Sequence, residues 1–420
     1  MKRLFGVGAA VILAAGLGSC SRTEPPKAPS TLVQTDSGQV LGRVLDSGVK
    51  AWLGIPYAKP PVRDLRWREP QANSWTGVYN ADRKMSECIQ VLRPHNINHY
   101  FGEESTSEDC LFMNIWAPPD ATASSNLPVI VFIYGGGGTI GSSGMANYDG
   151  EQVAARRAVF VNFNYRVGIL GFMAHPELTK EQGGHSGNYG YMDQTFALKW
   201  IQKNIAAFGG DPAKVIISGQ SAGAGSVVQQ IFSPQAKGLF RGGVMLSGCN
   251  YTGSNRPLAE AEEVGLEIQK RLEVATLDDM RQIPADRILA IQNESQVGRA
   301  VQGIRTGGVI DGYFMPGTKA EILEAHGAAD VPIIASFTHD EANSPLKAAK
   351  TVAEYQKIAR EVFGKAADEF LALYPVASDA DVPVMAQQSA NDGAGLLNSV
   401  TCGELQAKYN SSPTFITTYS

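Results

Sequence analysis

The sequence G-Q-S-A-G at residues 219–223 constrains the fold of this chain more than any other feature. It follows a β-branched run at residues 215–217 and opens a stretch compatible with a helix. A serine on such a tight strand-to-helix turn leaves no room for side chains two positions away, so glycines are needed on both sides. The alternative is a glycine-rich turn with an unreactive serine. The preceding strand favours the first interpretation, in which Ser221 is a nucleophile.

Strand-like and helix-like segments alternate through the centre of the chain. Short β-branched runs predict buried strands at residues 129–134, 158–164, 215–217, 244–246 and 331–337. Apolar spacing predicts an amphipathic helix over residues 194–208, and helix-forming residues predict helical insertions over 255–330 and 345–400. This order is typical of one large α/β domain, a mostly parallel sheet with helices on both faces.

Four consecutive glycines, residues 135–138, follow the strand predicted at 129–134. They offer backbone N–H groups without obstructing side chains, and the Ala222 N–H lies at the start of the predicted helix. Such donors stabilise a developing oxyanion. A phosphate-binding loop is the alternative interpretation. The G-K-[ST] and G-x-G-x-x-G patterns that would support it are missing, so an oxyanion loop is favoured.

The composition argues against two classes of protein, namely disordered chains and nucleic-acid-binding proteins. The 420 residues are 44% hydrophobic and 18% charged, which excludes wholesale disorder. The formal net charge is −5 and there is no basic run, so nucleic acid is not expected as a partner.

The first residues predict export. Lys2 and Arg3 precede an uncharged apolar run, residues 4–17, that is too short for a membrane span. The run ends in L-G-S-C, which resembles a bacterial lipobox with Cys20 as the lipidated residue; an ordinary secretory signal is the alternative. We expect a signal peptide at 1–19, a flexible tether at 20–34 and a folded domain at 35–420. The protein would then reside in the bacterial envelope, with membrane contact only through the anchor on Cys20.

Four more cysteines fit an oxidising compartment. Cys88 and Cys110 lie 22 residues apart and flank a polar stretch, where a bridge would add roughly 3 kcal/mol. Cys249 and Cys402 have no obvious partners, and Cys249 is interpreted as a buried thiol.

Several motifs together resemble type-B carboxylesterases, a branch of the α/β hydrolases. Residues 208–223 are similar to the family's active-site serine motif, and E-D-C-L-F-M-N at 108–114 is similar to its second motif. Shorter similarities lie at residues 54–58, 60–61, 164–168, 187–188 and 193–194. The resemblance covers roughly residues 35–420. It implies an α/β-hydrolase fold and hydrolysis of small-molecule esters with no metal or cofactor and no protein partner.

The resemblance also implies roles for individual residues. Ser221 would accept the acyl group, and Gly136, Gly137 and Ala222 would form the oxyanion hole. Glu341 would be the acid of the triad, its neighbour Asp340 being less suited. Two further pairs are implied, a disulfide between Cys88 and Cys110 and a structural ion pair between Arg166 and Asp193. Gln220 stands where the family commonly has a glutamate.

The third member of the implied catalytic triad, the histidine that acts as general base, has no candidate at the expected place in the sequence. Chain order in this fold is serine, acid, histidine, yet the six histidines are His95, His99, His175, His185, His326 and His339. None follows Glu341. His339 is too close to the acid in sequence, and His185 alone has a loop that could approach the site. The resemblance implies that the terminal strand-like run at 414–419 precedes a histidine loop and that a partner of Cys402 lies there too. We expect a chain incomplete at its C-terminus; natural degeneration is the competing interpretation. We therefore expect low activity from this chain.

Other functions within the family stay open. A non-catalytic adhesion-type module is one, although such proteins commonly lose the serine. A lipase is another, with Gly138 widening the site where the family often has phenylalanine. A cholinesterase is not expected, because residues 88–110 hold no tryptophan to face a quaternary ammonium.

Overall fold

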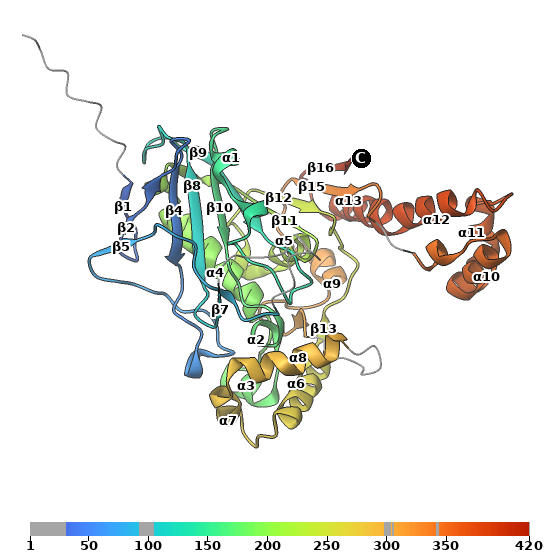
Figure 1. Cartoon of the computed structure of the whole chain (residues 1–420), viewed down its shortest axis with the longest axis horizontal. Coiled ribbons are helices and arrows are strands. Elements are labelled where there is room, and N and C mark those ends of the chain that lie inside the picture. The colour runs from blue at the N-terminus through green and yellow to red at the C-terminus, as the bar shows by residue number, and fades with distance from the viewer. Residues whose placement is uncertain (1–30, 92–104, 298–303, 305, 342–343, 420) are drawn as a thin grey trace, which may run out of the picture. The chain divides into compact units, whose positions relative to one another are not determined.

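The computed structural model describes residues 31–91, 105–297, 304, 306–341 and 344–419 (Figure 1). The predicted signal peptide, Cys20, His95 and His99 lie outside the described residues. Residues 31–420 form one compact unit. Within the described residues, no helix has the length and apolar character needed to cross a bilayer.

A nine-stranded sheet organises the described residues, in the order β16-β15-β12-β11-β9-β10-β8-β4-β3. Its strands are β3 (Arg43–Val44), β4 (Lys50–Pro56), β8 (Phe112–Ala117), β9 (Leu127–Ile133), β10 (Val159–Phe163), β11 (Gly210–Gln220), β12 (Gly242–Leu246), β15 (Ile333–Thr338) and β16 (Thr414–Tyr419). The strands from β16 to β10 run parallel, and β8, β4 and β3 continue antiparallel. The five predicted strands are confirmed, as is the mostly parallel sheet.

Three small sheets accompany the large one. They consist of β1 (Leu32–Gln34), β2 (Gln39–Leu41) and β5 (Val78–Asn80); of β6 (Glu87–Cys88) and β7 (Thr106–Ser107); and of β13 (Arg256–Pro257) and β14 (Val309–Ile310).

Helices cover both faces of the large sheet (Figure 1). Successive strand side chains point to opposite faces. Val159 and Val161 of β10 therefore join the main core with Val227 of α5, whereas Phe160 joins a smaller core with Ala154 of α1. The helices are α1 (Glu151–Ala154), α2 (Gly168–Phe172), α3 (Pro176–Glu181), α4 (Tyr189–Asn204), α5 (Ala222–Phe232), α6 (Leu258–Leu272), α7 (Leu277–Gln282), α8 (Ala285–Val297), α9 (Lys319–Glu324), α10 (Val352–Phe363), α11 (Ala367–Leu373), α12 (Val382–Ala390) and α13 (Leu397–Tyr409).

The helical predictions are confirmed with shifted bounds. The helix expected over 194–208 begins earlier, at Tyr189, and its last residues, Ile205–Phe208, form a 3₁₀ turn before Gly209 at φ +93°. The insertion at 255–330 contains α6 to α9, and the one at 345–400 contains α10 to α12. Threonine capping boxes begin α7, α9 and α10, which explains where these helices start.

Two disulfides cross-link the fold. Cys88 and Cys110 are paired as predicted, with their Cα atoms 4.9 Å apart. Cys249 and Cys402 are also paired, with Cα atoms 6.4 Å apart. The interpretation of Cys249 as a free buried thiol is therefore wrong, and so is the expectation that the partner of Cys402 lies after residue 420. These two cysteines are separated by 153 residues, and they meet only because α13 packs on β15 and β16 next to β12.

The long-range disulfide is expected to stabilise the fold more than the short-range one. The chain-entropy model gives about 5 kcal/mol for closing 153 residues and about 3 kcal/mol for closing 22. The double variant Cys249→Ala/Cys402→Ala should therefore lower the free energy of unfolding in urea further than Cys88→Ala/Cys110→Ala. All four sulfurs are buried, which makes the pairs a matched comparison. Equal losses would contradict this ranking.

Candidate active site

Ser221 occupies a strained turn between β11 and α5. Its backbone has φ 55° and ψ −123°, a conformation that costs a non-glycine residue of order 1–3 kcal/mol. Hydrogen bonds hold it in place, because its N–H donates to the Leu246 carbonyl at 2.9 Å and its carbonyl accepts from the Gly225 N–H at 3.0 Å. The predicted strand-to-helix turn is therefore present, with Ser221 at its tip.

Two glycines make this turn possible. A Cβ atom on Gly219 would lie 2.4 Å from the Gly223 carbonyl carbon, and one on Gly223 would lie 2.1 Å from the Ile133 carbonyl oxygen. Both partners are backbone atoms that cannot move aside. The glycine requirement inferred from the sequence follows from these contacts.

The glycine loop lies directly against the serine turn. A Cβ atom on Gly135 would be 3.2 Å from the Ser221 Cβ and 2.5 Å from the Gln220 carbonyl oxygen. The two segments, 86 residues apart between Gly135 and Ser221, therefore meet as the sequence analysis required. Gly136, Gly137 and Gly138 follow at φ +109°, +65° and +71°.

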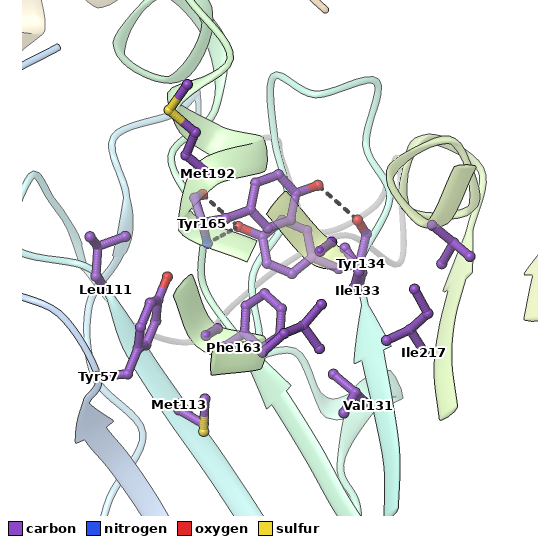
Figure 2. Close-up of a cluster of buried hydrophobic side chains, with 14 of the residues drawn as sticks. Tyr57, Leu111, Met113, Val131, Ile133, Tyr134, Phe163, Tyr165, Met192 and Ile217 are labelled. Carbon is purple, nitrogen blue, oxygen red and sulfur yellow. Dashed lines mark hydrogen bonds between the residues drawn. The ribbon is translucent and has the colours of Figure 1, made fainter. Parts of the chain in front are cut away.

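A tyrosine pair anchors the start of this loop (Figure 2). The Tyr134 and Tyr165 rings stack with centroids 4.4 Å apart. The Tyr165 hydroxyl donates to the Tyr134 carbonyl at 2.8 Å, and the Tyr134 hydroxyl donates to the Tyr165 carbonyl at 3.0 Å. Both side chains are buried. This reciprocal pairing fixes the backbone immediately before Gly135.

The predicted oxyanion donors have free N–H groups among the described residues. The N–H groups of Gly136 and Gly137 make no hydrogen bond there, and neither does that of Ala222, the first residue of α5. The positive end of the eleven-residue helix α5 adds to the field at this point. The arrangement is able to bind negative charge beside the Ser221 hydroxyl.

Ser221 and Glu341 line the same cavity. Its volume is about 400 Å³, and its lining comprises Ser221, Ser247, Gly248, Cys249, Asn250, Phe337, Glu341, Gly395, Asn398 and Ser399. Glu341 follows β15, and its Oε2 accepts a hydrogen bond from the Thr338 hydroxyl. Its neighbour Asp340 contacts His339 at 2.7 Å and is outside the lining. The structure thus brings together the predicted nucleophile and the predicted acid.

The histidines of the described residues are engaged elsewhere. His185 lies 3.2 Å from a Glu69 oxygen and stacks on Tyr313, and it is not among the residues that line the Ser221 cavity. His175 contacts Gln269 at 3.0 Å, and His326 contacts the Tyr409 carbonyl at 2.9 Å. No histidine lines the cavity in this part of the chain. No group of three or more His, Cys, Asp or Glu side chains there could hold a metal ion.

Arg166 and Asp193 form the buried ion pair that the sequence analysis interpreted as structural. Two guanidinium hydrogen bonds of 2.8 and 2.7 Å join them, and the Arg166 N–H adds a third at 3.0 Å. Burial raises the pKa of the Asp193 carboxyl, an effect that Arg166 opposes. Arg166 follows Tyr165, so this pair supports the tyrosine anchor rather than contacting the Ser221 cavity.

Sequence reasoning missed part of the site. Ser247, Asn398 and Ser399 line the cavity, yet no motif marks them. Ser247 could have been found, since it directly follows β12, and ligands commonly bind beyond the carboxyl ends of parallel strands. Sequence reasoning also missed that Arg66 pairs with Glu108 of the second motif. The Arg66 guanidinium donates two hydrogen bonds, of 2.7 and 2.6 Å, to the Glu108 carboxylate.

Comparisons with known proteins show the family and the fold of this chain. A model described as the carboxylesterase family matches residues 29–388. The chain is 37% identical over 385 residues to fumonisin B1 esterase of Sphingopyxis macrogoltabida, covering 88% of this chain and 68% of that protein. It is 37% identical over 328 residues to cocaine esterase of Oryctolagus cuniculus, covering 74% of this chain and 59% of that protein. A solved structure of PNB esterase aligns with a TM-score of 0.74 at 30% identity, covering 93% of this chain and 79% of the other.

Gly223 and Gly225 lie on the same helix but differ in the space around them, so a substitution at Gly225 serves as the control for one at Gly223. Gly223→Ala places a methyl group against two backbone carbonyls, and we expect a loss of about 3 kcal/mol or more in the free energy of unfolding. Gly225→Ala, two residues along the same helix, meets nothing within 4 Å and should gain about 0.5–1 kcal/mol. Urea unfolding measures both. Similar stabilities for the two variants would contradict the tight contact at Gly223.

Proposed function

Because this chain belongs to the carboxylesterase family, we propose that it is a serine hydrolase that cleaves carboxylic esters through an acyl-enzyme on Ser221. The observation that carries the proposal is the contact of the glycine loop with the Ser221 turn. It combines the hydroxyl of a strained, half-buried serine with unpaired backbone donors, which is the arrangement that acyl transfer needs.

The first step is attack of the Ser221 Oγ on the ester carbonyl carbon. The carbonyl oxygen becomes an oxyanion that the N–H groups of Gly136, Gly137 and Ala222 bind. Removal of one such donor typically costs about 3–4 kcal/mol of barrier. The proton lost by Ser221 is transferred to the departing alkoxide, which leaves as the alcohol. Water then attacks the acyl-enzyme, releases the acid and returns a proton to the Ser221 oxygen.

Glu341 orients and stabilises the protonated form of an imidazole base in this scheme. Thr338 supports the carboxylate through its hydroxyl hydrogen bond. Because the histidines of the described residues lie outside the Ser221 cavity, we propose low turnover from this chain alone. The oxyanion hole and substrate binding by themselves leave a residual acceleration of about 10³-fold.

We propose small-molecule esters as substrates. The relatives of this chain include a fumonisin B1 esterase, a cocaine esterase and a para-nitrobenzyl esterase. A second cavity of about 400 Å³, lined partly by Phe172, Arg256 and Glu260, adjoins the glycine loop, since a Cβ atom on Gly138 would lie 3.8 Å from Phe172. This cavity is a suitable place for one end of the ester.

Export to the bacterial envelope, with a lipid anchor on Cys20, completes the proposal. The N-terminal sequence supports it, and the two disulfides fit an oxidising compartment.

Covalent labelling tests the nucleophile. A fluorophosphonate incubated with the full chain should give one adduct per molecule by intact mass, located on Ser221 by peptide mapping. Ser221→Ala should lose the adduct. Ser247→Ala, which changes another serine of the same cavity, should retain it. An adduct that persists in Ser221→Ala would place the nucleophile elsewhere and refute the proposal.

A further inference from the structure

We infer that the outward face of the small sheet β1-β2-β5 rests on the surface of a lipid bilayer and so orients the folded domain on the membrane. The inference goes beyond ester hydrolysis. It rests on the part of the proposed function that places a lipid anchor on Cys20, and it adds a second membrane contact, made by the folded domain itself.

Strand pairing divides the side chains of this sheet between two faces. Val33 of β1 pairs with Val40 of β2, Val40 pairs with Tyr79 of β5, and all three belong to the main core. Because successive side chains of a strand point to opposite faces, the residues on either side of these three form the outward face. They are Leu32, Gln34, Gln39, Leu41, Val78 and Asn80, and all of them are exposed.

Three aliphatic side chains lie next to one another on the outward face. Leu32 pairs directly with Leu41, and Val78 pairs with Gln39, two residues before Leu41. Their exposed fractions are 46%, 38% and 48%. The other members of the face are two glutamines and an asparagine, so the face carries no charge. An uncharged face with adjacent aliphatic groups suits the boundary between lipid headgroups and acyl chains.

The chain enters the folded domain beside this face. The Thr31 hydroxyl donates to the Gly42 carbonyl at 2.8 Å. The Thr31 carbonyl accepts from the Gly42 N–H at 3.2 Å and from the Trp52 indole N–H at 2.7 Å. Leu32 directly follows Thr31, and Leu41 directly precedes Gly42. The point at which the tether joins the domain is therefore fixed next to the aliphatic side chains.

The length of the tether limits which surface of the domain can meet the bilayer. Thr31 lies 11 residues after Cys20. Even fully extended, that length of chain spans at most about 40 Å. A folded domain of this size is roughly 50 Å across, so an anchor on Cys20 does not reach around it. The surface around Thr31 is the part of the domain that a bilayer holding this anchor meets first.

Charged side chains in the segments that flank the three strands balance one another. Asp36, in the turn between β1 and β2, lies 3.7 Å from the Lys203 ammonium. The others are Arg43, Asp46, Asp82 and Arg83, all exposed and two of each sign. Anionic headgroups are therefore neither strongly attracted nor repelled on this side. The contact depends on the aliphatic groups, and salt should change it little.

A domain resting on this face keeps the Ser221 cavity accessible. The Trp200 indole N–H donates to the Ser37 hydroxyl at 3.1 Å, and β1 contacts the 3₁₀ turn Ile205–Phe208 that leads into β11. Ser221 follows the opposite end of β11. The paired length of β9 and β11 between these two ends is about 20 Å. The cavity is thus held away from the bilayer, where esters dissolved in water reach it.

Quenching by lipids tests the contact. The full chain, lipidated on Cys20, is placed in vesicles of phosphatidylethanolamine and phosphatidylglycerol, with a fluorescent label on Gln39→Cys in the middle of the face. A doxyl-labelled lipid should quench this label at least about threefold more than the same label on Leu266→Cys. Leu266 lies on α6, is 47% exposed and serves as the matched control. Equal quenching at the two positions would overturn the inference.

A triple variant removes the aliphatic groups. Leu32→Gln/Leu41→Gln/Val78→Gln introduces the residue type that the same face already carries at positions 34 and 39. Quenching of the label at position 39 should fall to the level at position 266, while the chain stays on the vesicles through its anchor. Circular dichroism and fluorophosphonate labelling of Ser221 verify that the variant is folded. For the chain with its aliphatic groups intact, quenching in about 1 M salt should be unchanged. Quenching that persists in the triple variant, or that salt abolishes, would contradict an apolar contact.

Vesicle flotation separates this inference from its premise. If the full chain floats with the vesicles, Cys20→Ser does not, and position 39 is not quenched, the face fails and the anchor stands. If the full chain does not float, the proposed anchor fails. A histidine tag in place of residues 1–20, bound to a nickel-chelating lipid, then holds the domain at the same distance, and the same comparison of positions 39 and 266 decides on the face.

A second copy of the chain is the competing occupant. If the label at position 39 is shielded without vesicles and the mass in solution is that of a dimer, the face is a protein interface and the inference falls. Labelling of Ser221 by a fluorophosphonate should be the same in every one of these outcomes, so the proposed hydrolase activity is tested independently.

Discussion

Three backbone segments approach one another closely at the site, and this approach determines how its residues are arranged. The end of β9, the Ser221 turn and the first turn of α5 pass so near to one another that a Cβ atom on Gly223 would lie 2.1 Å from the Ile133 carbonyl oxygen. Only glycine fits between such backbones. The serine hydroxyl and the amides of the glycine loop lie close together because no side chain separates the two backbone segments that carry them.

The close approach of the glycine loop and the Ser221 turn follows from the order and register of the strands that precede them. β9 and β11 are parallel neighbours, and their register pairs Ile133 with Gly219. Both strands therefore end at the same edge, one in the glycine loop and the other in the serine turn. The tyrosine pair fixes the loop from behind, and the buried Arg166–Asp193 pair fixes the strand connection that carries Tyr165. Catalytic geometry here follows from strand order plus a few buried polar contacts.

Short sequence patterns were enough to predict the Ser221 turn and the glycine loop, because each is formed by residues that are neighbours in the sequence. The turn at Ser221 and the glycine loop each follow a buried strand, and hydrophobic periodicity identifies both strands. Glu341 was placed through family resemblance, since an acid near a strand end has no local mark. The Cys249–Cys402 bridge was missed because its two cysteines lie 153 residues apart, and the cavity residues of α13 were missed because the other lining residues are also distant in sequence. Packing of α13 on the sheet decides these contacts, and no short sequence pattern encodes it.

The two halves of the site differ in how firmly they are held. Ser221 and the glycine loop follow central strands that contribute buried side chains such as Val131, Ile133 and Ile217 to the core. Glu341 is exposed and follows β15, whose outer neighbour β16 has exposed apolar side chains such as Phe415 and Tyr419. Segments with few buried contacts open at lower free energy than central strands do. Ser221 and the glycine loop are therefore held by the core of the sheet, whereas Glu341 lies beyond the end of β15 and lines the same cavity as Asn398 and Ser399 of α13.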